Sequence, residues 1–114
     1  MKLKTTDIIG GSGTTTTVAA QTSDLLATQV GKYLRFTYAG NITLNVPTEA
    51  SAALPADGEW HIRNASPTGN LTIAAASGVM INPPYNGSLV IPPNGTVTLK
   101  RVAADTFDLM GQTV

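Results

Sequence analysis

Apolar side chains recur at every second position between Lys32 and Met110, and short segments rich in Gly, Pro, Asn and Asp separate the runs. A period of two is typical of a β-strand with one buried face. The apolar groups are Leu34/Phe36/Tyr38, Ile42/Leu44/Val46, Trp60/Ile62, Leu71/Ile73, Val79/Ile81, Leu89/Ile91, Val97/Leu99 and Phe107/Leu109. The pattern predicts an all-β domain of about eight short strands.

The segments between these runs predict the connections. Ala39-Gly40-Asn41 fits a tight hairpin turn between strands at 33–38 and 42–46, because Gly and Asn accept positive φ. Residues 47–59 contain two prolines, so we expect a loop that crosses from one sheet to the other. Further turns are expected at 66–70, 77–78, 82–87, 92–95 and 103–105. This rhythm predicts an antiparallel two-sheet sandwich or a jelly-roll-like barrel.

A weak internal similarity links two stretches of the chain. Gly40-Asn41-Ile42-Thr43-Leu44 and Gly69-Asn70-Leu71-Thr72-Ile73 each place a Gly-Asn pair before an alternating strand. A true repeat would extend further, so we interpret the similarity as shared turn chemistry.

The first 22 residues differ in composition from the rest. A Gly-Gly-Ser-Gly stretch at 10–13 precedes four threonines, which favours a flexible and then an extended segment. Leu3, Ile8 and Ile9 supply apolar side chains that can pack on a partner but are too few to fold alone. We therefore expect an extended N-terminal arm at 1–22 and a β-sandwich module at 23–114.

Composition and charge narrow the function. A chain of 114 residues supports one domain, and seven basic and seven acidic residues give no net charge that would attract nucleic acid or an anionic membrane. Lys100 and Arg101 could join Lys2, Lys4, Lys32, Arg35 and Arg63 in a basic patch, but few aromatic residues accompany them, so we expect no nucleic-acid partner. Without cysteine there is no disulfide or thiolate metal site.

No stretch has the length of a membrane span or the apolar run of a signal peptide. We therefore expect no membrane partner, and a protein that functions where it is made or in a particle assembled there.

Candidate catalytic residues form no recognisable set. His61, the one histidine, lies between Trp60 and Ile62 in an alternating strand, so we expect it on the outer surface. A Ser-His-Asp set built on His61 and Asp105 lacks the spacing of a nucleophile elbow, and the glycines at 10–13 lack the Gly-Lys-Ser/Thr of a phosphate-binding loop. We expect no enzymatic activity, no cofactor, no metal and no small-molecule ligand.

Several segments together carry a resemblance to a known module. They are residues 30–36, 41–47, 60–64 and 71–75, then Gly-Val-x-Ile-Asn at 78–82, Pro-x-Gly-x-Val-x-Leu-Lys within 93–100, and a Thr-x-x-Leu-x-Gly ending at 106–111. Over roughly residues 24–111 the chain resembles a β-module common in tailed-bacteriophage virion proteins. Such modules occur in tail fibres and in small proteins that decorate the head, and they carry no catalytic residues.

The resemblance implies a structural role in a virion. Tail fibres are usually long multidomain trimers, whereas this chain begins at Met1 and holds one module and one arm, which favours a capsid decoration (cement) protein. We expect a homotrimer on the outer surface of the capsid, made in the host bacterial cytoplasm. It would bridge neighbouring subunits of the major capsid protein through Leu3, Ile8 and Ile9 of the arm.

A second hypothesis remains open at this point. The chain could be a tail-fibre or receptor-binding module that recognises a bacterial surface glycan or protein. Its candidate contacts are then the turn residues Tyr85, Asn86 and Asn94.

Overall fold

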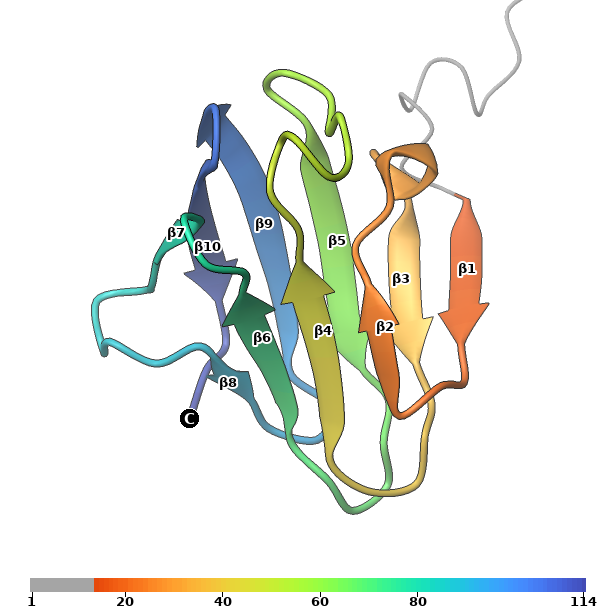
Figure 1. Ribbon diagram of the computed structural model, residues 1–114. Helices are drawn as coiled ribbons and strands as arrows, with labels where there is room; N and C mark the ends of the chain where they lie inside the picture. The colour runs from red at the N-terminus through yellow and green to blue at the C-terminus, as the bar shows by residue number, and fades with distance from the viewer. Residues whose placement is uncertain (1–13) are drawn as a thin grey trace, which may run out of the picture.

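The computed structural model describes residues 14–114, which form two β-sheets and a single short 3-10 helix, η1 (Figure 1). The strands are β1 (Thr15–Val18), β2 (Thr22–Asp24), β3 (Tyr33–Phe36), β4 (Ile42–Val46), β5 (Glu59–Asn64), β6 (Leu71–Ala75), β7 (Met80–Asn82), β8 (Val90–Ile91), β9 (Thr96–Ala103) and β10 (Thr106–Gly111), and η1 spans Ala27–Gln29. The prediction of a β-rich fold is confirmed. The described residues contain ten strands rather than about eight, because two of them, β1 and β2, precede the alternating region.

The chain winds around the body and changes sheet at almost every step. One sheet has six strands in the order β1-β3-β5-β9-β10-β7, and the other has four in the order β2-β4-β6-β8. From β1 to β9 each strand lies in the sheet opposite to that of its predecessor, and among the described strands β9 and β10 alone are consecutive within one sheet. The two sheets lie as layers against one another (Figure 1).

This winding makes both sheets mixed, which corrects the predicted antiparallel arrangement. Strands β1, β3 and β5 pair in parallel, as do β2, β4 and β6, whereas β5–β9, β9–β10 and β6–β8 are antiparallel. The sheets are also open at their edges, so the jelly-roll-like barrel is not confirmed. Alternation along one strand reports which face is buried but not the direction of the neighbouring strand, so the sequence pattern could not separate these arrangements.

The expected hairpin at Ala39-Gly40-Asn41 is a turn between sheets. β3 belongs to the six-stranded sheet and β4 to the four-stranded sheet, so the turn joins two layers rather than two paired strands. Gly40 has a φ of 145°, and a Gly-Asn sequence that supports positive φ serves this corner as well as a hairpin. The loop after β4 crosses to β5 in the opposite sheet, as predicted.

The two similar stretches lie side by side. β4 and β6 pair in parallel with Ile42 opposite Leu71 and Leu44 opposite Ile73, so the stretches occupy equivalent positions in successive turns of the winding. The corners before them also touch, since a Cβ added at Gly69 would overlap the carbonyl oxygen of Gly40. The similarity therefore reflects equivalent structural positions as well as shared turn chemistry.

An aliphatic core with three large aromatic rings fills the space between the sheets. Its fully buried large side chains are Trp60, Phe36, Phe107, Leu25, Leu34, Ile42, Leu44, Ile62, Leu71, Ile73, Ile91 and Leu99. The ring centroids of Trp60 and Phe107 are 6.3 Å apart at a tilted angle of 57°, within the range of favourable aromatic pairs. The indole Nε1–H of Trp60 donates to the backbone oxygen of Leu26 at 3.0 Å, so this buried donor is satisfied.

Part of the segment predicted as an arm belongs to this body. Strand β1 pairs along its length with β3, and Val18 packs against the core. The strand pairings of the body therefore begin at Thr15 rather than after residue 22. Within residues 14–114, no helix has the length and apolar character needed to cross a membrane.

Candidate interaction surface

The outward face of the six-stranded sheet carries polar side chains on three neighbouring strands. The inward residues of β3, β5 and β9 are buried, and the residues between them point away from the core. These outward residues are Tyr33, Arg35, Glu59, His61, Arg63, Thr96, Thr98 and Lys100. Strand register aligns them in rows, so residues far apart in the sequence become neighbours on one surface.

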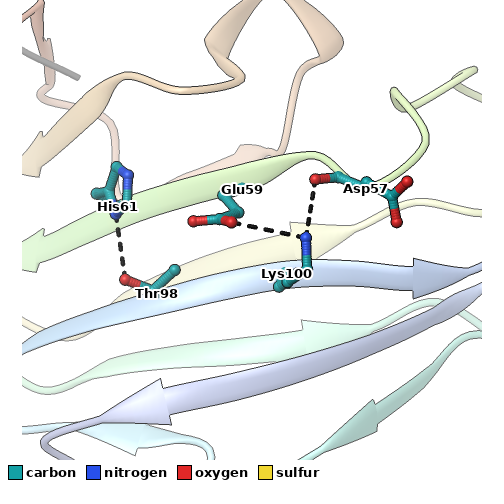
Figure 2. A network of polar contacts seen from close by, with 5 residues as sticks. All are labelled: Asp57, Glu59, His61, Thr98 and Lys100. Carbon is teal, nitrogen blue, oxygen red and sulfur yellow. Dashed lines mark hydrogen bonds and ion pairs between the residues drawn. The ribbon is translucent and has the colours of Figure 1, made fainter. Parts of the chain in front are cut away.

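An outward network joins β5 to β9, and Figure 2 shows its five residues. We use this name for Asp57, Glu59, His61, Thr98 and Lys100. The Nζ of Lys100 donates to the backbone oxygen of Asp57 at 3.1 Å and lies 3.6 Å from Oε2 of Glu59. The His61 Nδ1 lies 3.1 Å from the Thr98 Oγ1. The network links the two strands at the protein surface, where water competes for each contact.

The candidate catalytic groups take separate partners. The Asp105 Oδ1 accepts the backbone N–H of Glu49 at 2.7 Å, whereas the side chain of His61 contacts Thr98. In the part of the chain that the structure describes, no group of three or more histidine, aspartate or glutamate side chains is placed to hold a metal ion. What the arrangement offers chemically is hydrogen bonding and charge on a sheet face.

Two arginines of this face lie on neighbouring strands, β3 and β5. Arg35 and Arg63 are directly opposite in the parallel pair. Arg63 donates to the Thr96 Oγ1 at 3.3 Å and the Asn94 Oδ1 at 3.4 Å. The two ion pairs found among residues 14–114 involve other basic side chains, so neither of them includes Arg35 or Arg63.

The turn residues of the second hypothesis lie on two different connections. Tyr85 is fully exposed in the loop between β7 and β8. Its neighbour Asn86 donates to the backbone oxygens of Thr113 and Val114, both at 3.3 Å, so its amide is used to hold the C-terminal end. Asn94 has a φ of 68° in the turn between β8 and β9, and its side chain contacts β5 instead. Tyr85 alone presents a side chain without such an internal role.

The predicted arm contacts Leu3, Ile8 and Ile9 lie outside the described residues, and their role stays a prediction. The basic pair Lys100 and Arg101 is divided between the two faces of β9. Lys100 points outward, whereas Arg101 is buried and lies 3.4 Å from Oε1 of Glu49. The alternation along β9 indicates that Arg101 points inward, because Arg101 shares its face with the buried apolar residues of that strand.

Sequence reasoning missed a buried polar cluster at the corner where the chain leaves β5. We call Gly40, Asn64, Ser66 and Gly69 the corner network. The Asn64 amide nitrogen donates to the backbone oxygens of Gly69 and Ile91 at 2.9 Å, and its Oδ1 accepts the N–H of Ser66 at 3.0 Å. The Ser66 Oγ accepts the N–H of Gly69 at 3.0 Å and donates to the oxygen of Gly40 at 3.1 Å. These bonds fasten the two successive corners to each other.

The place of Asn64 could be read from alternation, since it continues the inward series begun by Trp60 and Ile62. Its bond to Ile91 could not, because Ile91 lies on β8 and is 27 residues further along the chain. The fold thus defines an open, mixed two-sheet β-sandwich with a polar outer face. No family model, curated protein or solved structure matches this chain.

Proposed function

We propose that this protein is a structural component of a bacteriophage virion, a homo-oligomeric decoration protein that binds the outer surface of the capsid and bridges neighbouring major capsid subunits. The observation that supports this most is the division of the body into a tightly packed apolar core and outward sheet faces that carry hydrogen-bonding groups. Such a body is suited to rigid attachment. The resemblance of residues 24–111 to virion modules agrees with this role.

The point where residues 1–13 join the body favours their use as an attachment segment. They lead directly into β1, which is an edge strand, so the segment starts at the side of the sandwich. Fully extended, thirteen residues span roughly 45 Å, which is enough to reach from one subunit surface to the next. In this proposal Leu3, Ile8 and Ile9 fill apolar positions on the shell, and several arms on one oligomer add their contacts together.

A binding experiment with empty heads tests this role. Because β1 begins at Thr15, the deletion must end at Gly13, so that the edge strand is kept. We expect the deletion, and the triple substitution of Leu3, Ile8 and Ile9 by Ser, to abolish co-sedimentation with heads. The matched control replaces Lys2 and Lys4 by Ala and should bind normally. Full binding of the triple variant would contradict the proposed arm contacts. If the parent protein itself failed to bind heads, the decoration role would be contradicted.

Salt provides an independent test of the forces involved. With no net charge, a clamp of this kind depends mainly on apolar burial and main-chain hydrogen bonds. We expect capsid occupancy to change little between low and moderate NaCl, as measured by densitometry of purified particles. Near-complete release in moderate salt would mean that charge pairs hold the protein on the shell.

One observation favours the second hypothesis, a receptor-binding module. Tyr85 is a fully exposed aromatic residue at a loop tip, and such side chains commonly anchor ligands at recognition surfaces. A Tyr85→Ala variant should then lose binding to bacterial cells or arrayed surface glycans, whereas Tyr33→Ala on the sheet face should keep it. No cell or glycan binding by the parent protein would remove this alternative.

A further inference from the structure

The four edges of the two sheets are protected to very different degrees against pairing with another chain. At the edge of the four-stranded sheet, the backbone oxygen of Val90 on β8 accepts the N–H of Val114 at 2.8 Å. The side chain of Asn86 fastens the same C-terminal end. The chain's own terminus therefore covers the edge at β8.

Two further edges are short. β7 has three residues, and Pro83 and Pro84 follow it directly, which prevents a longer ladder from forming there. β2 also has three residues, and it carries the charged Asp24. Short strands, prolines and charges are the usual means by which sheet edges avoid pairing with other chains.

Strand β1 is one residue longer than β2 and β7, and it has neither a charge nor a proline. Its four residues are three threonines and a valine, all uncharged and of high β-propensity. It lies at the side of the body opposite to β7 and β8 (Figure 1). Among residues 14–114 it pairs with β3 alone, so one side of its ladder has no partner within the described body.

The hydrogen bonds to β3 show which backbone groups face the open side. The N–H of Tyr33 donates to the oxygen of Thr14 at 2.9 Å, and the N–H of Thr37 donates to the oxygen of Val18 at 3.0 Å. Because backbone groups alternate in direction along a strand, the N–H and C=O groups of Thr15 and Thr17 point away from β3. These two residues are placed symmetrically about Thr16.

We propose that this edge binds a second copy of the chain, through antiparallel pairing of β1 with β1 about a two-fold axis at Thr16. In that register Thr15 lies opposite Thr17 of the partner subunit, and the reverse pair repeats the contact. Each pair exchanges both of its N–H···O bonds, as in a regular antiparallel ladder. The six-stranded sheets of two copies thereby become one continuous sheet.

A second copy suits this edge because the edge is complementary to itself. A two-fold contact places the same surface of both copies together. Such a contact is destabilised where like charges meet, and it is favourable where the outward groups are uncharged and symmetrically spaced. Here the outward backbone groups match under the rotation, and the facing side chains are threonines on both copies. The pairing gives a dimer in place of the trimer expected from the sequence, and it goes beyond the proposed capsid role.

Charge substitutions test both the contact and its register. Analytical ultracentrifugation of the full chain should give a dimer. In the Thr15→Lys/Thr17→Lys variant both cross-copy pairs become positive, and the dissociation constant should rise about tenfold or more. In the Thr15→Lys/Thr17→Glu variant both pairs become opposite in charge, and the dimer should persist at low salt.

A matched control and the contrary outcomes complete the test. Thr22→Lys places one charge on the edge of β2 and should leave the dimer intact, and melting curves check that each variant is folded. A monomeric or trimeric parent would overturn the proposal, as would a dimer that the double lysine variant leaves unchanged. A monomeric parent that dimerises after deletion of residues 1–13 would also overturn it, because the chain's own leader would then occupy the edge. Capsid binding is measured separately, so these outcomes are distinct from failure of the decoration role.

Discussion

Two polar networks of similar size differ sharply in their exposure to water. In the corner network, Asn64 and Ser66 are no more than 1% exposed, and their side chains bond to the backbone oxygens of Gly69 and Gly40. In the outward network, the side chains of Lys100 and Glu59 are 33% and 48% exposed, and their contact is an ion pair in water. Both networks join segments distant in the sequence, but water can replace the contacts of the outward network only.

This difference in solvent access should decide what each network does. A buried donor or acceptor that loses its partner costs about 1–3 kcal/mol, whereas an exposed ion pair contributes about 0–1 kcal/mol. We therefore assign the corner network to holding the fold and the outward network to shaping a surface. Three sets of substitutions test this assignment, and a fourth tests the arginine pair beside the outward network.

The largest effect is expected at Gly69. A methyl group there would meet the backbone of Gly40 and Asn41, which cannot move without separating the two corners. Gly69→Ala should therefore lower the free energy of unfolding by more than about 3 kcal/mol in urea titrations. Gly78 is the control, because a Cβ there meets nothing within 4 Å, and Gly78→Ala should cost only about 1–2 kcal/mol from its φ of 91°. Equal losses at the two sites would refute the packing argument.

Removal of the buried amide should come next. Asn64→Ala leaves the N–H of Ser66 and the oxygens of Gly69 and Ile91 without their side-chain partner, and we expect a loss of about 2–3 kcal/mol in the same titration. The exposed Asn45, whose amide donates to Asp24 at 3.2 Å, is the matched control. If Asn45→Ala proved as costly, burial would not be the factor that separates the networks.

The ion pair of the outward network should matter much less. Lys100→Ala removes the contacts with Glu59 and the oxygen of Asp57, and we expect thermal unfolding to report a loss below about 1 kcal/mol that shrinks as salt is added. A loss as large as that of Asn64→Ala would show that this surface contributes to the fold.

The smallest effect has the opposite sign. Arg35→Glu places a carboxylate beside Arg63 in the parallel pair, which should raise the free energy of unfolding by about 0.2–1 kcal/mol at low salt. Arg35→Gln removes the like charge without adding attraction, so its gain should be smaller. Destabilisation by both variants would mean that packing of the aliphatic part of Arg35 on the sheet contributes more to stability than its positive charge costs.

Much of this body was predictable from local pattern. Alternation identified the buried faces of most strands, such as Trp60 and Ile62 on β5, and Gly, Pro and Asn marked the connections between them. The same alternation placed His61 on the outer face. These features follow from the geometry of a single strand or turn, so a stretch of a few residues is enough to specify them.

Tertiary structure alone decided which strands became neighbours. The corner at Gly40 joins two sheets instead of two hairpin strands, and the stretches beginning at Gly40 and Gly69 meet as equivalent positions of successive windings. The bond between Asn64 and Ile91 and the place of β1 at an edge of its sheet follow from the same choice. Period-two alternation fixes the direction of side chains, but pairing depends on long-range packing of whole strands, and no local sequence signal records which strand lies beside which.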